Sequence, residues 1–318
     1  DVEVLFYDTT SLHFEIDQPD RGDGEEDIVH GSLAAGCKPY KAPRKHGLSK
    51  NGRSDAPQIV VGLAVTREGF PVRHWVFPGN TVDVSTVAQV KRDLRDWQLT
   101  RCLFVGDAGM VSAANFKALA AGGGKYLMCM PLRRGDALTE QVLARAGRYR
   151  SVTQRLQIKE VVIGDGERRL RYVLCFNPEE AVRQQAHRQY LLREVQAELA
   201  AMGDAAQDVQ SKRVAELRTS RRYGKYLKLG TKGLELDAKA IKAAEHYDGK
   251  FIVHGNDDTL SAEDMALGYK QLMRVEQAWR DMKSTLDMRP VFHWAPHRIH
   301  AHVAITVLSP LPERTVEH

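Results

Sequence analysis

Residues 102–109 read CLFVGDAG, and this stretch decides the fold. Its apolar first half is typical of a short buried strand, and Asp107 follows where that strand ends. Apolar residues at helical spacing predict a helix over 83–97 before it, and a second helix is expected over 112–121 after it. Residues 125–130 again resemble a strand. Because strands and helices alternate here, we expect an α/β fold with parallel strands in its core.

Three further strands are predicted nearer the N-terminus. Residues 2–7 form an apolar, β-branched run that ends at Asp8, and residues 11–14 continue it. Residues 59–65 form a second run, which a short turn joins to a third over 71–77, as in a β-hairpin. The expected sheet is therefore mixed, with antiparallel strands beside the parallel ones, and is flanked by helices.

The character of the sequence changes at Leu132. Four segments are expected after it: a β-hairpin within 151–176, a helix over 181–202, a basic stretch interleaved with tyrosines over 211–232, and a long helix over 261–283. The apolar pattern of the core resumes before that last helix. We therefore predict one α/β domain in two parts, 1–131 and 247–318, interrupted by an insertion subdomain over 132–246.

The composition is that of a globular protein. The chain has 318 residues, of which 43% are hydrophobic and 27% are charged, so disordered and fibrous classes are excluded. No apolar run approaches the roughly 18 residues that a membrane-spanning helix needs, so no membrane partner is expected. The formal net charge of +5 is compatible with a nucleic-acid partner but is too small to identify one.

The ends and the cysteines of the chain suggest its setting. The chain begins with Asp1 and shows no leader segment, so we expect a piece of a longer protein. Its four cysteines are scattered without the spacing of a zinc site, and free buried thiols are expected. These features favour a cytoplasmic location.

Three carboxylates stand at positions suited to a metal site. Asp8 and Asp107 each follow a predicted strand, and functional groups collect at the carboxyl ends of parallel strands. Glu276 lies in the long helix, which could pack across that end of the sheet. Two hard divalent cations about 3.5–4 Å apart, held by oxygen ligands, can activate water in phosphodiester chemistry. The ordinary alternatives are a turn or cap role for each Asp and a solvated Glu276.

One face of the long helix carries a second set of polar residues. Tyr269, Glu276, Arg280 and Lys283 are separated by 7, 4 and 3 residues, which aligns them along one side of a continuous helix. Such a face could hold a metal ion at one end and a phosphate backbone at the other. The alternative is an ordinary ion pair between Glu276 and Arg280, worth a few tenths of a kcal/mol.

Several motifs occur in a fixed order along nearly the whole chain. They are FYDTT at 6–10, FVGDAG at 104–109, and the series Tyr269, Glu276 and Lys283, with HGLSKNGR at 46–53, FPGNT at 77–81, RPVFH at 289–293 and RIHAH at 298–302. The first three resemble the DDE transposases of the insertion-sequence 4 superfamily, whose signature helix carries Tyr, Arg, Glu and Lys. The other four resemble its 1634 group in particular.

The resemblance implies a ribonuclease H-like catalytic core interrupted by an insertion before the last catalytic helix. It implies that Asp8, Asp107 and Glu276 bind two Mg²⁺ ions, for which Mn²⁺ can substitute. Tyr269 and Lys283 would contact the DNA of the transposon end. One departure concerns the signature Arg, whose position is Leu272 here. Arg280 is the best substitute for that contact.

Other basic residues are candidates for phosphate contact. Residues 38–53 contain six basic residues and no acid, among them Lys45, Lys50 and Arg53. Arg298 is a candidate from the resemblance. The basic and aromatic residues of 211–232 also suit a DNA backbone. A solvated surface is the alternative interpretation for each stretch.

The activity that the resemblance implies is cut-and-paste DNA transposition. A metal-dependent endonuclease step would cut at the terminal inverted repeats, and strand transfer would join the freed 3′-hydroxyl to target DNA. The expected partners are these DNAs and a second copy of the chain in a synaptic complex, within a bacterial-type nucleoid. Two alternatives stay open: a plain metal-dependent nuclease of the same fold, and a truncated remnant that binds DNA without completing the reaction.

Overall fold

The computed structural model describes residues 3–16, 18–20, 43–50, 52–96, 102–132, 135–166, 169–202, 207–230, 233–284, 286 and 288–309. The first residues of the basic stretch, 38–42, and Cys37 lie outside these ranges. The chain divides into two compact units. The first comprises Asp1–Pro131, Val162–Tyr172 and Val253–His318, and the second comprises Leu132–Val161 and Val173–Ile252.

The described residues contain a nine-stranded mixed sheet with the order β3-β2-β1-β4-β5-β11-β8-β7-β6. Its strands are β1 Val4–His13, β2 Gln58–Val65, β3 Pro71–Pro78, β4 Leu103–Gly106, β5 Lys125–Met130, β6 Arg150–Thr153, β7 Leu156–Ile163, β8 Leu170–Phe176 and β11 Lys250–Gly255. The division between the two units falls within β7, β8 and β11.

The first unit holds the part of the sheet that matters for the site. β2 pairs antiparallel with β1 and with β3, whereas β4 pairs parallel with β1 and β5 pairs parallel with β4. Every residue of β2 is buried, as expected of a strand covered on both faces. This arrangement confirms the expected mixed α/β sheet with the strand order of a ribonuclease H-like core.

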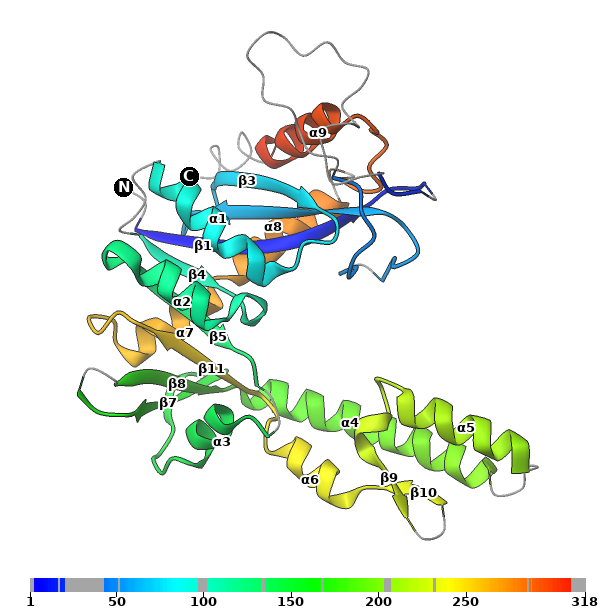
Figure 1. The fold of residues 1–318 in the computed structure, drawn as a ribbon. Helices are drawn as coiled ribbons and strands as arrows, with labels where there is room; N and C mark the ends of the chain where they lie inside the picture. Colours follow the sequence, from blue (N-terminus) through cyan, green and yellow to red (C-terminus); the bar gives the residue numbers. More distant parts are fainter. Residues whose placement is uncertain are drawn as a thin grey trace. The chain divides into compact units, whose positions relative to one another are not determined.

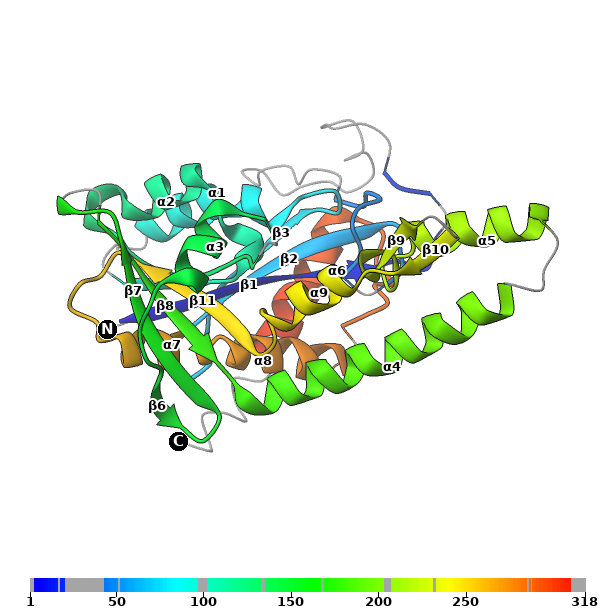
Figure 2. The ribbon, with the colours of Figure 1, turned by 90° about the horizontal axis from the view of Figure 1, so that it is seen from below.

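Helices cover both faces of this sheet (Figures 1 and 2). One face carries α1 Asp83–Asp96 and α2 Ala113–Ala120, and the other carries α7 Ala262–Lys270 and α8 Met273–Ser284. A fifth helix, α9 Pro296–Leu308, packs against β3. Beneath α1 and α2, apolar residues of the sheet and helices form one core cluster that includes Tyr7, Val87, Leu94 and Phe104.

Two predicted elements differ from the structure. The first strand does not end before Asp8 but continues through it to His13, because its ladder with β2 runs from Phe6↔Val65 to His13↔Gln58. The long helix expected over 261–283 is two helices, with a turn at residues 271–272 between α7 and α8. Leu272 in that turn is buried, so the interruption turns an apolar side chain toward the core.

The second unit is built from strands and longer helices. It contains α3 Ala137–Ala144, α4 Pro178–Met202, α5 Gln207–Thr219, α6 Ala238–Glu245, and a small antiparallel pair of β9 Leu227–Gly230 and β10 Gly233–Leu236. Arg213 of α5 forms an ion pair of 2.7 Å with Glu198 of α4, which ties these two helices together. In the described part of the chain, no helix is both long and apolar enough to span a membrane.

Candidate active site

Two predicted site residues lie on neighbouring parallel strands. The pairing of β1 with β4 runs Val4↔Leu103, Leu5↔Phe104 and Phe6↔Val105. Extending that register by two residues sets Asp8 opposite Asp107. Because side chains alternate in phase along paired strands that lie about 4.8 Å apart, the two carboxylates point to the same side of the sheet. The structure therefore brings Asp8 and Asp107 together.

The environment of Asp8 disfavours its negative charge. The side chain is half-buried, and its pKa is raised from 3.8 to about 6, first because burial removes it from water. The negative charges of Asp107 and Asp83 raise this pKa further, whereas Lys50 and the backbone N–H of Thr9 lower it. Three carboxylates thus share one electrostatic neighbourhood.

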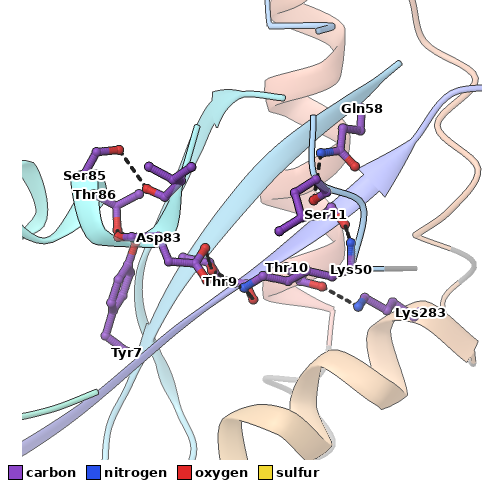
Figure 3. A network of polar contacts seen from close by, with 12 residues as sticks. Tyr7, Thr9, Thr10, Ser11, Lys50, Gln58, Asp83, Ser85, Thr86 and Lys283 are labelled. Atoms are coloured by element: carbon purple, nitrogen blue, oxygen red, sulfur yellow. Dashed lines mark hydrogen bonds and ion pairs between the residues drawn. The ribbon is translucent and has the colours of Figure 1, made fainter. Parts of the chain in front are cut away.

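Asp83 is the carboxylate that the sequence analysis did not assign to the site. It stands in the first turn of α1. Its carboxylate accepts a hydrogen bond of 2.5 Å from the Thr9 hydroxyl and forms an ion pair of 2.8 Å with Lys50 (Figure 3). A Cβ atom added at Gly109 would lie 3.2 Å from Asp83 Oδ2, so the turn after Asp107 also packs closely on it.

Lys50 links the loop before β2 to β1. Its Nζ donates to the Thr9 carbonyl at 2.9 Å and to the Thr9 hydroxyl at 2.6 Å, and its backbone N–H donates to Ser11 Oγ at 2.9 Å (Figure 3). The buried Gln58 holds the same loop by donating to the Leu48 carbonyl at 3.3 Å, and it also donates to the Gly79 carbonyl after β3 at 2.8 Å. Lys50, predicted to contact DNA, therefore also compensates the charge of Asp83 within the protein.

Glycines allow this loop to approach so closely. A Cβ atom at Gly47 would lie 2.0 Å from the Gly79 carbonyl oxygen, and one at Gly79 would lie 2.0 Å from the Gln58 carbonyl oxygen. No side chain fits at either position without moving the backbone. Gly47 belongs to the HGLSKNGR motif and Gly79 to the FPGNT motif, so close packing of the backbone explains these two glycines of the motifs.

Helices α7 and α8 each bring one predicted residue to these strands. Tyr269 of α7 donates a hydrogen bond of 3.0 Å to Asp107 Oδ1. Burial raises the pKa of the Tyr269 hydroxyl, and the neighbouring Cys129 and Asp107 raise it further, so this tyrosine stays a proton donor. Lys283 of α8 donates to the Thr10 hydroxyl, directly after Asp8 and Thr9 on β1 (Figure 3).

The charge of Lys283 is weakened by its surroundings. Burial lowers its pKa to about 8, and the cations Arg289 and Lys50 lower it further, whereas Asp8 raises it. Asp8 is therefore close enough to Lys283 for each to influence the other. The expected contact of Lys283 with DNA stays a prediction.

Glu276 differs from the two aspartates in its exposure to solvent. α8 packs on β1 and β2 through Val275, Ala278, Trp279 and Met282, which are buried, whereas Glu276 is exposed. Of the contacts described, none joins Glu276 to Asp8 or Asp107. Among the described residues, no three His, Cys, Asp or Glu side chains are already arranged to hold a metal ion.

The donors of the site nevertheless suit a hard divalent cation. Carboxylate oxygens are the ligands that Mg²⁺ prefers. The pKa of Asp8 is raised first by burial and further by the negative charges of Asp107 and Asp83, and a nearby dication would favour the ionised carboxylate. The residues present therefore fit a divalent metal at Asp8 and Asp107.

The other predicted DNA-binding residues occupy different surroundings. Lys45 Nζ donates to the Asp20 carbonyl at 2.9 Å. Arg53 forms ion pairs with Glu15 at 3.0 Å and with Asp55 at 3.1 Å, so its charge is compensated within the protein. Arg280 on α8 and Arg298 on α9 are exposed to solvent.

Three comparisons bear on the identity of the chain. The sequence profile of a family described as "Transposase DDE domain" matches residues 28–309. No curated protein matches the chain. Two solved structures are similar to parts of it. One is the piggyBac transposase synaptic complex with hairpin DNA, at a TM-score of 0.42 and 10% identity. The other is the Mos1 transposase paired-end complex with left transposon end, at a TM-score of 0.21 and 15% identity.

The matches differ in how much of each chain they include. The piggyBac match covers 96% of this chain and 45% of that chain, and the Mos1 match covers 37% and 32%. This chain thus spans less than half the length of either transposase. The family match, in contrast, includes most of the present chain, from before β2 to the end of α9. The chain belongs to the family of transposase DDE domains.

Proposed function

We propose that the chain is the catalytic domain of a DNA transposase, which cuts DNA at transposon ends and joins the freed ends to target DNA with the help of divalent metal ions. The observation that carries the proposal is the pairing of Asp8 with Asp107 across parallel strands, with Tyr269 and Lys283 reaching the same strands. The family membership agrees with it.

In this proposal Asp8 and Asp107 hold the metal ions, Mg²⁺ or Mn²⁺, and Glu276 is the third ligand. The ions would supply an activated water and a counter-charge for the leaving oxygen. Tyr269 fixes the orientation of Asp107 by donating to Oδ1, which leaves the other oxygen for the metal. Lys283 supplies a cation beside β1 that suits a DNA phosphate.

Asp83 and Lys50 act as positioning residues in the same proposal. Their ion pair of 2.8 Å, bridged by Thr9, ties the start of α1 and the loop before β2 to the strand residue that follows Asp8. Because Thr9 is buried and bonded to both residues, β1 is held against α1 and the loop before β2. The DNA contacts proposed for Lys45, Arg53, Arg280 and Arg298 add a general electrostatic attraction.

The experiment that tests the function uses the DNA that flanks the gene. The purified chain is incubated with labelled duplexes of both flanks and a supercoiled plasmid, with Mg²⁺, with Mn²⁺ or with EDTA. We expect cuts at defined positions near the ends and joined products in the plasmid, and neither product in EDTA. Cutting without joining would favour the plain nuclease, and binding without cutting would favour the non-catalytic remnant.

Asp107→Asn is the decisive variant for the site. Asn keeps an oxygen that can accept from Tyr269 but removes the charge, so we expect cutting to fall below detection while DNA is still bound. The matched control is Asp258→Asn, because Asp258 is exposed in the loop after β11 and away from the site. Cutting at the wild-type rate by Asp107→Asn would show that the metal assignment is wrong.

A further inference from the structure

The second unit contains a pocket that the proposed catalytic site does not use. Its volume is about 580 Å³, which is within the range of small-ligand sites. Residues of α4, the turn at 221–226 and α6 line it. The basic stretch over 211–232, which the sequence analysis singled out, therefore contributes directly to a concave site.

The lining of the pocket is strongly basic. It includes His187, Arg188, Arg221, Arg222 and Lys225, whereas Asp248 is the one carboxylate among the lining residues that the structure describes. Most of that carboxylate charge is already compensated. Arg188 is only 4% exposed and donates to both oxygens of Asp248, at 2.7 and 2.6 Å. The bidentate pair forms a neutral wall of the pocket.

Two cations of the pocket have no described carboxylate partner. Arg222 is paired with Glu194 at 2.7 Å and lies over the rings of Tyr190 and Tyr223. Arg221 and Lys225 are exposed, and the contact described for the Lys225 ammonium is with the face of the Tyr226 ring, 4.9 Å from its centroid. Arg221 and Lys225 together leave an uncompensated charge of about +2 at the pocket, which the imidazole of His187 also lines.

Part of the remaining lining is apolar and buried. Leu191, Tyr226 and Ala240 are each at most 5% exposed and belong to three different elements. An apolar floor below a cationic edge suits a molecule with an anionic group attached to a flat, less polar body. Phosphate beside a sugar or base has this chemistry, and two cations with free donors match its oxygens.

We propose that this pocket is a second DNA-binding site, in which Arg221 and Lys225 each bind one of two neighbouring phosphates of the DNA backbone and the adjoining nucleotide lies over the apolar floor. The choice of DNA over other phosphate-bearing molecules rests on the proposed function. The pocket itself, and its preference for a phosphate, do not depend on that function.

The test is DNA binding by the full chain without divalent metal. Fluorescence anisotropy of a labelled duplex in EDTA is measured over a range of salt concentrations. For the double variant Arg221→Ala/Lys225→Ala we expect affinity to fall about tenfold or more, and the slope of log K against log[salt] to decrease by about 2, since each lost phosphate contact removes about 0.9.

Matched variants distinguish an effect of the pocket on DNA binding from the effects of net charge and of misfolding. Lys239→Ala/Lys242→Ala removes the same charge from exposed positions on α6 outside the pocket and should leave the slope within about one of wild type. The swap Arg221→Lys/Lys225→Arg keeps both charges and should restore binding. Equal losses in both alanine variants, or an unchanged slope in Arg221→Ala/Lys225→Ala, would overturn the proposal.

A last experiment tests whether the bound phosphate belongs to DNA or to a small molecule. Isothermal titration of the full chain with pyrophosphate and with deoxyadenosine monophosphate tests for a free ligand. If these bind the wild type and not the pocket variant, while DNA affinity is the same for both, the site serves a small phosphate compound and DNA is excluded. In EDTA, Asp107→Asn should bind DNA as wild type does. A loss of DNA cutting, which tests the proposed function, is therefore measured independently of a loss of DNA binding at the pocket.

Discussion

At the scale of single residues, Asp8 has a pH dependence that can be tested without activity. Its pKa in the folded chain, about 6, lies above its ordinary value of 3.8. The folded state therefore holds the proton more tightly than the unfolded state between these values. Stability without metal is unaffected below about pH 4, falls as the pH rises through this window, and is reduced by about 3 kcal/mol above it.

Asp8→Asn removes the group that titrates. In EDTA at pH 8 we expect the variant to melt at a higher temperature than wild type, whereas at pH 4 the two should melt together. Differential scanning fluorimetry over pH 4–8, with Asp258→Asn as the exposed control, measures this. A constant difference between Asp8→Asn and wild type at every pH would contradict the raised pKa of Asp8.

The candidate site residues could be predicted from the sequence, but the residues that contact them could not. Asp8, Asp107, Tyr269 and Lys283 could be named as candidates from the sequence, but Asp83 gave no signal beyond an acid in the first turn of a helix. Its role depends on contacts with Thr9 and Lys50, which are distant in sequence. Whether Glu276 joins the site stays a prediction, because its side chain is exposed in the structure.

At the scale of elements, the same distant partners explain why the first strand was predicted too short. Asp8, Thr9 and Thr10 are polar, and a polar run ordinarily marks the end of a strand. Here Thr9 and Thr10 are buried within β1 because their hydroxyls are bonded to Lys50, Asp83 and Lys283. No local sequence pattern indicates these hydrogen bonds to the Thr9 and Thr10 hydroxyls. The apolar strands and the capped helix α2, in contrast, were predictable from their own residues.

The turn between α7 and α8 was also not predictable. Gln271 and Leu272 are ordinary helix residues, and neither glycine nor proline marks the interruption. The turn buries Leu272 to 4% exposure, at the position where the signature that the sequence resembles carries Arg. An arginine at this position would place an unpaired charge in the core, so the buried turn favours an apolar residue here.

Leu272→Arg tests that reason. We expect the substitution to destabilise the fold by about 3 kcal/mol or more, because the guanidinium loses its hydration without gaining a partner. Met273→Arg is the matched control, since Met273 is 63% exposed and the change should cost less than about 0.5 kcal/mol. Urea denaturation curves measure both. A Leu272→Arg variant as stable as wild type would mean that position 272 can reach solvent, and Arg280 would then lose its role as substitute.

At the scale of the whole molecule, metal binding should be visible as stabilisation. An ion that binds only the folded state raises its stability by about 2.7 kcal/mol at a concentration of 100 times Kd. We therefore expect Mg²⁺ and Mn²⁺ to raise the melting temperature of wild type in a concentration-dependent way. The double variant Asp8→Asn/Asp107→Asn should show no such rise.

The rise in melting temperature with metal also tests whether Glu276 is a metal ligand. If Glu276→Gln weakens the metal-dependent rise as much as Asp107→Asn does, the exposed side chain joins the metal site when the ion is present. If the rise is unchanged in Glu276→Gln but lost in Asp83→Asn, the third carboxylate comes from α1 instead of α8. The same titration thus distinguishes the predicted residue from the one that the structure places near the aspartates.

The register of β1 with β4 has a consequence for how this chain can vary. Asp8 and Asp107 face each other because a ladder of backbone hydrogen bonds aligns their strands, not because a fixed number of residues separates them. Insertions and deletions in the connections between residues 9 and 102 can leave the pair intact. A single residue gained or lost within 4–8 or 103–107 would turn one carboxylate to the opposite face of the sheet. Length variation among natural copies should therefore be frequent in the loops and absent from these two short segments.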